Sequence, residues 1–505
     1  MSEHLVNPEI VLGPPGTGKT TSLLNILDEE LERGVPPDRI GYVSFTRKAA
    51  DEAAQRACER FNLPRSDFPW FRTLHSLCFR RLGMRSAEVL EGPRMREFAD
   101  YARVRITGRW SEDGTLTGFE TGDRIMFMEN LSRIRGIPLR EQYDLDDDTL
   151  PWREVERVSR ALAEFKAAKG YMDYTDMLSE FVRMDTPPQL EVLLVDEAQD
   201  LSALQWRVVW LLARHARRVV VAGDDDQAIY RWAGADVDAL IDMQGDARVL
   251  GKSWRCPPVI QSLAGGIISS VRRRREKAWA PRDGEGTVDR VVDAANVDLS
   301  GEDILILARN EYIIREQFEP ALQRAGILYE RRGQPSIPTK MMRAVTDWER
   351  LRRGEPLPVE TLRELFEHMS SGRGVKRGHK KLPGWEETEE GTLGGLVQQG
   401  ILLTQAPWYE ALDRLPQDQV SYMRSALARG ESPRKRPRIR LSTIHGSKGG
   451  EADHVILSTE IAQRTWREMD TAPEDEARVW YVGVTRARKH LTIVDATTPR
   501  ACPWL

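Results

Sequence analysis

The stretch "IVLGPPGTGKTT" at residues 10–21 constrains this chain more than any other part of it. An apolar run enters a loop of glycine and proline, Lys19 follows the last glycine, and leucines at helical spacing follow Thr20. The loop fits the pattern G-x-x-x-x-G-K-[ST], whose glycines let successive backbone N–H groups turn toward phosphate oxygens. Because a strand pattern precedes the loop and an amphipathic helix pattern follows it, the sequence predicts a nucleotide-binding loop.

The expected contacts of this loop follow from the atoms that each position offers. Backbone amides and the ammonium of Lys19 would bind phosphate oxygens, and the hydroxyl of Thr20 would bind Mg²⁺. The predicted nucleotide contacts are Gly13, Pro14, Pro15, Gly16, Thr17, Gly18, Lys19, Thr20 and Thr21. A glycine-rich turn without a ligand is the alternative, and the loop by itself indicates only an NTP-binding protein.

An acidic pair in "LLVDEAQD", at residues 193–200, is the second feature. Asp196 would end a buried apolar strand and complete the shell of oxygen ligands around Mg²⁺. The adjacent Glu197 would orient and deprotonate an attacking water molecule. Together the two carboxylates predict nucleotide hydrolysis. The alternative is an N-cap, because acidic residues after a strand also begin helices.

Short β-branched runs that end in polar residues recur along the chain. Besides the run before the loop, they predict strands at 40–46, 191–197, 219–226, 303–310, 439–445, 454–460 and 490–496. Alternation of strands with helical stretches is typical of an α/β fold with parallel sheets, which bind ligands at the carboxyl ends of their strands. The segments 81–165 and 351–435 have no clear strand pattern, so we expect mostly helical insertions there.

Composition sets outer limits. A chain of 505 residues would hold roughly three or four domains of about 150 residues each. The four cysteines are isolated, which is typical of a reducing cytosol. Neither a membrane span nor a leader is apparent, so a cytoplasmic protein is expected. The net charge of −4 does not exclude nucleic acid, because local clusters decide such binding.

Three basic clusters stand out, at residues 272–277, 372–381 and 434–440. They are either solvated surface segments or contacts to a polyanion.

Five motifs, the acidic pair's among them, occur in a characteristic order. They are "VDEAQD" at 195–200, "GDDDQAIYRWAGAD" at 223–236, "STIHGSKGGEADHVIL" at 442–457 and "YVGVTRAR" at 481–488, and "LGKSWRCPPVI" lies at 250–260. With the phosphate loop, this series resembles the UvrD/Rep family of superfamily 1 (subgroup A) DNA helicases. The resemblance extends from Gly13 to Arg488.

The resemblance implies two RecA-like P-loop NTPase lobes with parallel sheets, each carrying a mostly helical insertion. The first lobe would span residues 1–80 and 166–245, with the phosphate loop and the Walker B acid, and its insertion 81–165. The second lobe would span residues 246–350 and 436–505, with the arginine fingers, and its accessory insertion 351–435. The lobes would face each other across one ATP with its Mg²⁺.

The resemblance also implies roles for residues outside the loop. Gln227 would contact the γ-phosphate, and Arg255 and Arg486 would reach it as arginine fingers, which contribute roughly 10³ to 10⁵ in rate. The alternative for both arginines is an ordinary ion pair. Trp254 matches the position of an aromatic residue that stacks on adenine, and Glu451 that of a residue near the ribose.

The residues that match DNA contacts are of two kinds. Phe45, Tyr230 and Trp232 would receive unstacked bases, at about 1–3 kcal/mol per stacked base. Thr73, His75, Thr443 and His445 would contact the DNA backbone. Core packing is the alternative for the aromatic residues, and a structural role is the alternative for the histidines.

The implied function is an ATP-dependent DNA helicase or translocase that moves on single-stranded DNA and unwinds duplex in replication, repair or recombination. Movement from 3′ to 5′ is expected by analogy with the closest branch of the family. The expected partners are single-stranded and forked DNA and replication or repair proteins, without a membrane. The protein would be a monomer or self-associate weakly, and it would be cytoplasmic and associated with the nucleoid.

Two other functions stay open at this point. One is a translocase that strips proteins from DNA without unwinding, and the other is a nucleotide-gated interaction module. Two departures from the family pattern bear on the mechanism. No glutamine precedes Gly13, where the family has one that reads adenine, and Ala233 stands where the family commonly has arginine. The second insertion is short, and no nuclease domain is expected after Arg488.

Overall fold

A computed structural model describes residues 7–44, 47–110, 116–118, 120–146, 150–432 and 435–505. The chain forms two compact units. The first unit consists of Met1–Glu285 and Thr471–Thr485, and the second of Gly286–Asp470 and Arg486–Leu505. Each unit is built on its own sheet.

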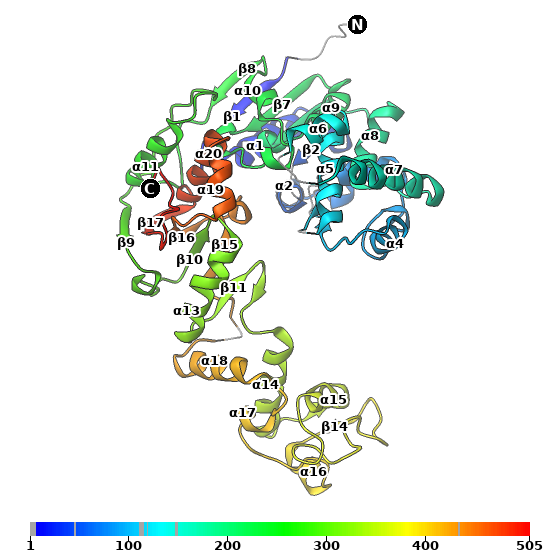
Figure 1. Cartoon of the computed structure of the whole chain (residues 1–505), viewed down its shortest axis with the longest axis vertical. Helices are drawn as coiled ribbons and strands as arrows, with labels where there is room; N and C mark the ends of the chain where they lie inside the picture. The colour runs from blue at the N-terminus through cyan, green and yellow to red at the C-terminus, as the bar shows by residue number, and fades with distance from the viewer. Residues whose placement is uncertain (1–6, 45–46, 111–115, 119, 147–149, 433–434) are drawn as a thin grey trace. The chain divides into compact units, whose positions relative to one another are not determined.

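The first unit contains a six-stranded sheet in the order β3-β2-β6-β7-β1-β8, and all neighbouring strands run parallel. Figure 1 labels β1, β2, β7 and β8 of this sheet. The strands are β1 (Glu9–Leu12), β2 (Ile40–Ser44), β3 (Phe71–Thr73), β6 (Val192–Asp196), β7 (Arg218–Gly223) and β8 (Asp246–Val249). The central strands are buried throughout, as expected for a parallel sheet that helices cover on both faces. Their carboxyl ends carry the phosphate loop and the polar residues of the predicted motifs.

Alternate residues of these strands pack on different helices. Tyr42, Leu194 and Val220 share a core with α1 (Lys19–Glu32) and α2 (Arg47–Phe61). Val43 and Leu193 share another core with helices on the opposite face. Those helices are α3 (Leu74–Arg81), α8 (Tyr174–Met184), α9 (Ala203–Ala213) and α10 (Val237–Ile241). The period-two alternation therefore gives a doubly wound layer structure.

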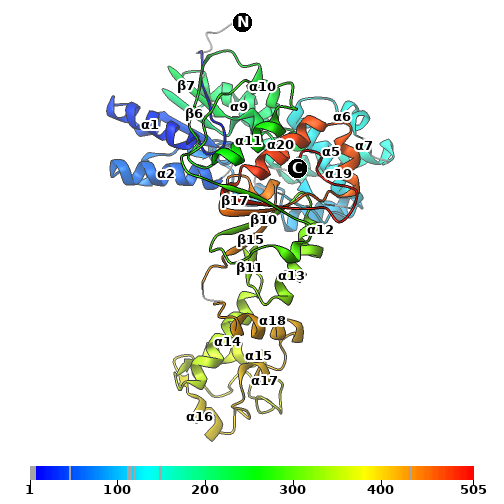
Figure 2. The same ribbon diagram turned by 90° about the vertical axis from the view of Figure 1, so that its left-hand side faces the viewer.

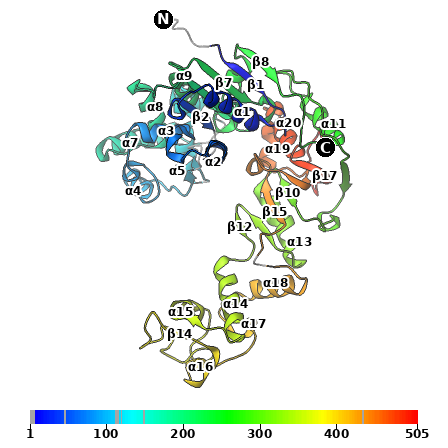
Figure 3. The ribbon, with the colours of Figure 1, turned by 180° about the vertical axis from the view of Figure 1, so that it is seen from behind.

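The remaining helices of the first unit form two further groups. The insertion folds around its own core with α4 (Pro93–Ala102), α5 (Thr121–Arg135), α6 (Leu139–Leu145) and α7 (Trp152–Lys169), and it includes the short pair β4 (Arg109–Trp110) and β5 (Leu116–Thr117). Figure 3 shows α4, α5 and α7 lying together. The second group is α11 (Pro258–Ile268) packed on α20 (Pro473–Val484).

The second unit contains a seven-stranded sheet in the order β12-β11-β15-β10-β16-β17-β9, parallel except between β11 and β12. The strands are β9 (Thr287–Val291), β10 (Ile304–Ala308), β11 (Tyr329–Arg331), β12 (Gln334–Pro335), β15 (Ile439–Thr443), β16 (Ala452–Ser458) and β17 (Ala487–Val494). Beside it lie α12 (Glu311–Ile313), α13 (Glu319–Arg324) and α19 (Gln463–Met469).

The accessory insertion of the second unit is mostly helical, and its helices are grouped in Figure 2. They are α14 (Thr339–Arg352), α15 (Val359–Glu367), α16 (Leu393–Gln398), α17 (Trp408–Ala411) and α18 (Gln417–Ala428), with the strand pair β13 (Leu357–Pro358) and β14 (Glu390–Gly391). One apolar core runs from the strands of the sheet into this insertion.

Each strand that the sequence predicts is present, and the α/β fold with two parallel sheets is confirmed. The strands that were not predicted are short or lie at the edges of the sheets. All four residues of β8 are exposed, and β9 is at most half-buried. Such strands lack the continuous apolar pattern on which the prediction depends.

The observed units correct the expected lobe boundaries. Residues 246–285 and 471–485, expected in the second lobe, belong to the first unit. The physical reason for the first of these segments is that β8 and the residues after it are hydrogen-bonded to the first sheet and to the phosphate loop. β8 extends the first sheet next to β1, and beyond β8 the N–H of Trp254 donates to the carbonyl of Gly16 over 2.8 Å.

Within the described ranges, no helix has both the length and the apolar character required to cross a bilayer.

A stacked histidine pair makes the stability of the second unit depend on pH. The rings of His454 and His490 lie parallel with centroids 4.1 Å apart, and His454 Nε2 contacts Thr492 Oγ1 at 2.8 Å. Burial, with His490 alongside, lowers the pKa of His454 to about 4. In the unfolded chain a histidine titrates near pH 6.5, so protons bind to the unfolded state first as the pH falls.

We therefore expect His454→Gln to flatten the decline in unfolding free energy between pH 6.5 and pH 4.5. The difference in slope would be at most about 1.4 kcal/mol per pH unit, the value for one proton. Urea unfolding of both proteins across this range measures it. Identical slopes would show that His454 does not carry the effect.

Candidate functional site

The predicted phosphate loop lies between the carboxyl end of β1 and the N-terminus of α1. Gly16 and Gly18 have φ angles of +70° and +83°, a region that side chains disfavour. Gly18 caps α1, so the positive end of the helix dipole meets the loop. Lys19 Nζ donates to the carbonyl of Gly13 over 2.9 Å, and the loop therefore curls around its own lysine.

The next feature is a set of oxygen atoms beside the loop. Thr20 Oγ1 and Tyr42 Oη donate to the same Asp196 oxygen, over 3.0 and 2.7 Å. Burial and the neighbouring Glu197 raise the pKa of Asp196. A bound divalent cation would instead stabilise the ionised form of Asp196. Hydroxyl and carboxylate oxygens are the ligands that Mg²⁺ prefers. The residues present therefore fit Mg²⁺, as the sequence predicts for Thr20 and Asp196.

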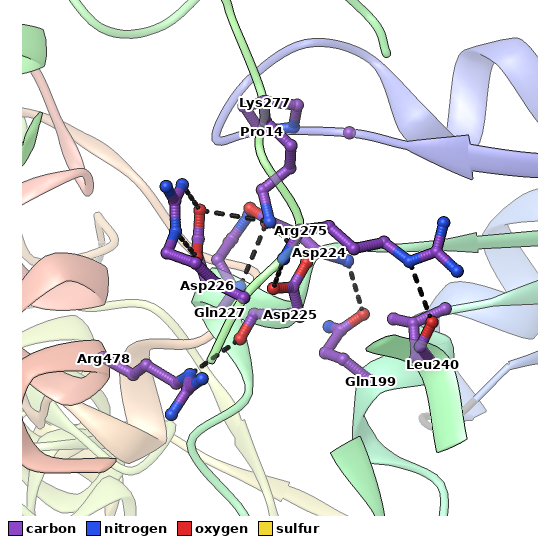
Figure 4. Close-up of polar contacts among 12 residues, drawn as sticks. Pro14, Gln199, Asp224, Asp225, Asp226, Gln227, Leu240, Arg275, Lys277 and Arg478 are labelled. Carbon is purple, nitrogen blue, oxygen red and sulfur yellow. Dashed lines mark hydrogen bonds and ion pairs between the residues drawn. The ribbon is translucent and has the colours of Figure 1, made fainter. Parts of the chain in front are cut away.

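A chain of hydrogen bonds starts from Glu197, which follows β6 with a φ angle of +53°. Gln199 Nε2 donates to the carboxylate of Glu197, and Gln199 Oε1 accepts from the N–H of Asp224 over 2.9 Å. Asp224 Oδ2 in turn accepts from Gln227 Nε2 over 2.6 Å, as Figure 4 shows for the last three residues. The structure thus links the predicted base Glu197 to the predicted γ-phosphate contact Gln227.

The sequence analysis assigned no role to Tyr42, Gln199 or Asp224. A signal for the last two was present, because both are polar residues just after predicted neighbouring strands. Tyr42 lies in a strand whose sequence is mainly apolar, so nothing in the sequence indicated a polar role for its hydroxyl. Its contact with Asp196 arises because β2 pairs with β6.

The segment after β8 packs directly on the phosphate loop within the first unit. Ser253 Oγ donates to the carbonyl of Pro15 over 2.7 Å, and the backbone of Trp254 binds Gly16. A Cβ atom at Gly16 would lie 2.3 Å from the Cβ of Arg255. The structure therefore brings Arg255 to the loop. The ring of Trp254 is exposed, as an adenine-stacking residue requires. Ser253 is a contact that the sequence analysis did not predict.

The other predicted site residues for ATP and DNA lie partly in the second unit. Arg486 is buried there, with Nη1 donating to the carbonyl of Gly450 over 3.2 Å. The carboxylate of Glu451 lies 3.5 Å from Arg488, and Thr443 Oγ1 accepts from Gly446. Thr443 is the last residue of β15, and His445 follows two residues later. The roles of these residues stay predictions.

The predicted DNA contacts of the first unit differ in exposure. The ring of Trp232 is 49% exposed and lies nearly parallel to that of Phe127 in α5, with centroids 6.2 Å apart. By contrast, His75 is buried against Tyr174, and Thr73 caps α3 by accepting from the N–H of Ser76. Tyr230 is partly buried. Phe45 lies outside the described residues.

The basic cluster at residues 272–277 is not the polyanion surface that the sequence suggested. Arg274 forms two hydrogen bonds with Asp226, and the side chain of Lys277 is fully buried against aspartates. The guanidinium of Arg275 binds backbone carbonyls. This prediction was wrong because the cluster faces an acidic loop 50 residues earlier in the chain.

The other two basic clusters differ from each other. In the cluster at 434–440, Arg436 pairs with Glu330 and Arg440 with Asp303. In the cluster at 372–381, Arg373, Lys376 and Arg377 are exposed. Only this last cluster presents its side chains mainly to solvent, among the residues that the structure describes.

Two family models match the chain. Residues 1–248 match the UvrD/REP helicase N-terminal domain, and residues 420–498 match the UvrD-like helicase C-terminal domain. The chain is 26% identical over 300 residues to "ATP-dependent DNA helicase PcrA" of Staphylococcus epidermidis, covering 55% of this chain and 40% of that protein. It is 26% identical over 321 residues to the protein of that name in Bacillus subtilis, with 55% and 39% covered.

A third relative is "Putative ATP-dependent DNA helicase YjcD" of Bacillus subtilis, 25% identical over 295 residues, with 55% of this chain and 38% of that protein covered. The matched region thus spans about two fifths of the length of these relatives.

The contact between Gly16 and Arg255 can be tested with Gly16→Ala. Gly34→Ala is a matched control, because Gly34 also has a positive φ angle, +87°, but no atom lies within 4 Å of the added methyl group. Both variants should lose about 1 kcal/mol of stability from the backbone conformation. Only Gly16→Ala should also weaken binding of a fluorescent ATP analogue, by about tenfold. Equal affinities in the two variants would contradict the contact.

Proposed function

The chain belongs to the UvrD/Rep family of superfamily 1 helicases, and we propose that it is an ATP-dependent motor that moves on single-stranded DNA and separates the duplex ahead of it. The observation that carries the proposal is the hydrogen-bond chain from Glu197 through Gln199 and Asp224 to Gln227. It connects a base for hydrolysis with an amide suited to sensing the γ-phosphate. A protein that only binds nucleotide has no need of this connection.

In the proposed reaction, Lys19 exchanges its bond to Gly13 for the β- and γ-phosphates. Thr20 and Asp196 would hold Mg²⁺, which would supply positive charge to neutralise the phosphates. Glu197 accepts a proton from the attacking water while Gln199 holds its carboxylate. The Gln227 amide contacts the γ-phosphate and changes its contacts when that group leaves.

Two arginines are proposed to stabilise the charge that develops during hydrolysis. The position of Arg255 beside Gly16 supports this role, and its Nη1 lies 3.5 Å from the carbonyl of Thr485. Arg486 directly follows Thr485 in the sequence. Its role rests on the sequence resemblance. Arginines of this kind contribute roughly 10³ to 10⁵ in rate.

The DNA side of the proposal rests mainly on Trp232. Its exposed ring stands five residues after Gln227, on a loop that packs against α5 at Gly234. A change at the γ-phosphate can therefore reach a ring suited to stacking on a base. Movement from 3′ to 5′, and a role in replication, repair or recombination with protein partners, are proposed by analogy with the family alone.

Removal of either central catalytic group tests hydrolysis. We expect Lys19→Ala and Glu197→Gln each to lower the DNA-stimulated ATPase rate at least 100-fold. Because the phosphate loop stays intact in Glu197→Gln, this variant should still bind ATP with wild-type affinity, whereas Lys19→Ala should not. Steady-state rates and binding of a labelled nucleotide give both quantities. Substantial turnover by Glu197→Gln would rule out Glu197 as the base.

Substitution of the exposed ring tests the DNA contact. Loss of one stacked base corresponds to about 1–3 kcal/mol, so Trp232→Ala should raise the oligonucleotide concentration that half-saturates ATPase stimulation by about five- to 150-fold. Its basal rate should change little. Tyr101→Ala is the control, because Tyr101 is similarly exposed but lies on α4. Equal losses of basal and stimulated rates in Trp232→Ala would contradict the assigned role.

The two alternative functions are separated by three measurements on the wild-type protein. A motor hydrolyses ATP faster with single-stranded oligonucleotides, whereas a nucleotide-gated interaction module shows no such stimulation. A forked-duplex unwinding assay, run in parallel with displacement of a DNA-bound protein, distinguishes a helicase from a translocase that only strips proteins.

A further inference from the structure

A lysine occupies the centre of the acidic loop that follows β7. Lys277 Nζ lies 3.1 Å from Asp224 Oδ1 and 3.1 Å from Asp226 Oδ2, and it also pairs with Asp225. The four side chains are between 0% and 2% exposed. Figure 4 shows the ammonium pointing at the three carboxylates. The ammonium thus stands where three acidic groups would otherwise suit a metal ion.

This arrangement follows from electrostatics. Three neighbouring carboxylates removed from water repel one another, and each is costly to bury without a cation. Lys277 supplies one positive charge, and Arg274 supplies a second with two bonds of 2.7 and 2.5 Å to Asp226. Burial opposes the ionisation of Asp224, yet Lys277 and Lys19 outweigh it and lower its pKa. Asp224 is therefore held as a carboxylate.

Asp224 connects this cluster to the proposed hydrolytic site. Its Oδ1 faces Lys277, while its Oδ2 accepts from Gln227. Its backbone N–H donates to Gln199, which holds Glu197. A carboxylate bound through both oxygens cannot rotate freely. The ammonium of Lys277, together with the N–H of Asp226 that donates to Oδ1 over 3.2 Å, therefore sets where Oδ2 meets Gln227.

Arg478 joins the same loop from α20. Its Nε donates to the carbonyl of Asp225 over 3.0 Å, and its Nη2 donates to the carbonyl of Arg273 over 2.8 Å. The side chain is buried. The cluster thereby connects β7, the segment 272–277 and α20, which are distant in sequence.

We propose that Lys277 is a positioning residue for ATP hydrolysis, which orients Asp224 so that Gln227 and, through Gln199, Glu197 stand in the geometry that hydrolysis requires. This inference rests on the proposed function. It predicts that loss of the ammonium slows the chemical step more than it weakens nucleotide binding, because the phosphate contacts are assigned to Lys19 and the backbone of the loop and not to Lys277.

A second lysine that pairs with two aspartates, Lys166, provides a control; its side chain is 12% exposed. Lys166 Nζ lies 2.7 Å from both Asp173 and Asp176, in a network between α7 and α8 that also contains Arg133. Lys166→Met and Lys277→Met both remove an ammonium that pairs with at least one fully buried aspartate, and both replace it with an uncharged chain of similar length. A purely structural role predicts similar behaviour for the two variants.

The experiment measures single-turnover ATP hydrolysis, nucleotide affinity and urea unfolding for the full-length wild type and variants. We expect Lys277→Met to hydrolyse ATP at least tenfold more slowly with less than a threefold change in affinity. Lys166→Met should lose comparable stability while its hydrolysis rate stays within twofold of wild type. Lys277→Arg, which keeps the charge, should recover part of the rate.

The double variant Lys277→Met/Asp225→Asn separates position from charge balance. It removes one excess negative charge without returning a cation to Asp224, so it should regain stability but not the hydrolysis rate. If Lys277→Met alone does not fold, the hydrolysis rate of this double variant is measured in its place. Recovery of the rate together with stability, or equal rate losses in Lys166→Met and Lys277→Met, would overturn the inference. A wild type that hydrolyses no ATP would refute the proposed function instead.

Discussion

The first unit depends on how it accommodates carboxylates at the buried end of a parallel sheet. β6 ends in the buried Asp196, and β7 is followed by the buried Asp224, Asp225 and Asp226. An isolated carboxylate there would be neutralised or would destabilise the fold. The structure instead surrounds these groups with hydroxyls, amides and buried cations. The side chains that satisfy these acids are therefore the same ones that define the candidate site.

The structure stabilises two of these buried carboxylates in different ways. Asp196 accepts hydrogen bonds from the neutral hydroxyls of Thr20 and Tyr42 and from the backbone N–H of Glu197, and its pKa is raised. Asp224 is paired with Lys277, and its pKa is lowered. The first arrangement leaves a carboxylate that gains from a divalent cation, while the second supplies its own cation. This contrast distinguishes the proposed Mg²⁺ ligand Asp196 from Asp224, which we propose Lys277 positions, at the ends of the adjacent strands β6 and β7.

The predictions from sequence succeeded where local pattern carries the information. Buried strands and the phosphate loop have strong local signals, because apolar runs and glycine positions follow directly from backbone geometry. The basic cluster at 272–277 was misread, since the acidic loop that faces Arg274 and Lys277 lies about 50 residues away in the chain. The expected lobe boundaries failed for a related reason. β8 is short and exposed, and only its pairing with β1 assigns it to the first sheet.

The sequence by itself determined the fold class, the phosphate loop and the residue types available for hydrolysis, since each depends on neighbours within a few positions. Only the tertiary structure decided which charges are paired internally and which donors reach Asp196 and Asp224. The physical reason is that a side chain's partner is set by which strand ends meet at one edge of a sheet. In the folded chain Tyr42 therefore lies beside Asp196, and Gln199 and Lys277 lie beside Asp224. In the sequence, Tyr42 and Lys277 are far from these partners.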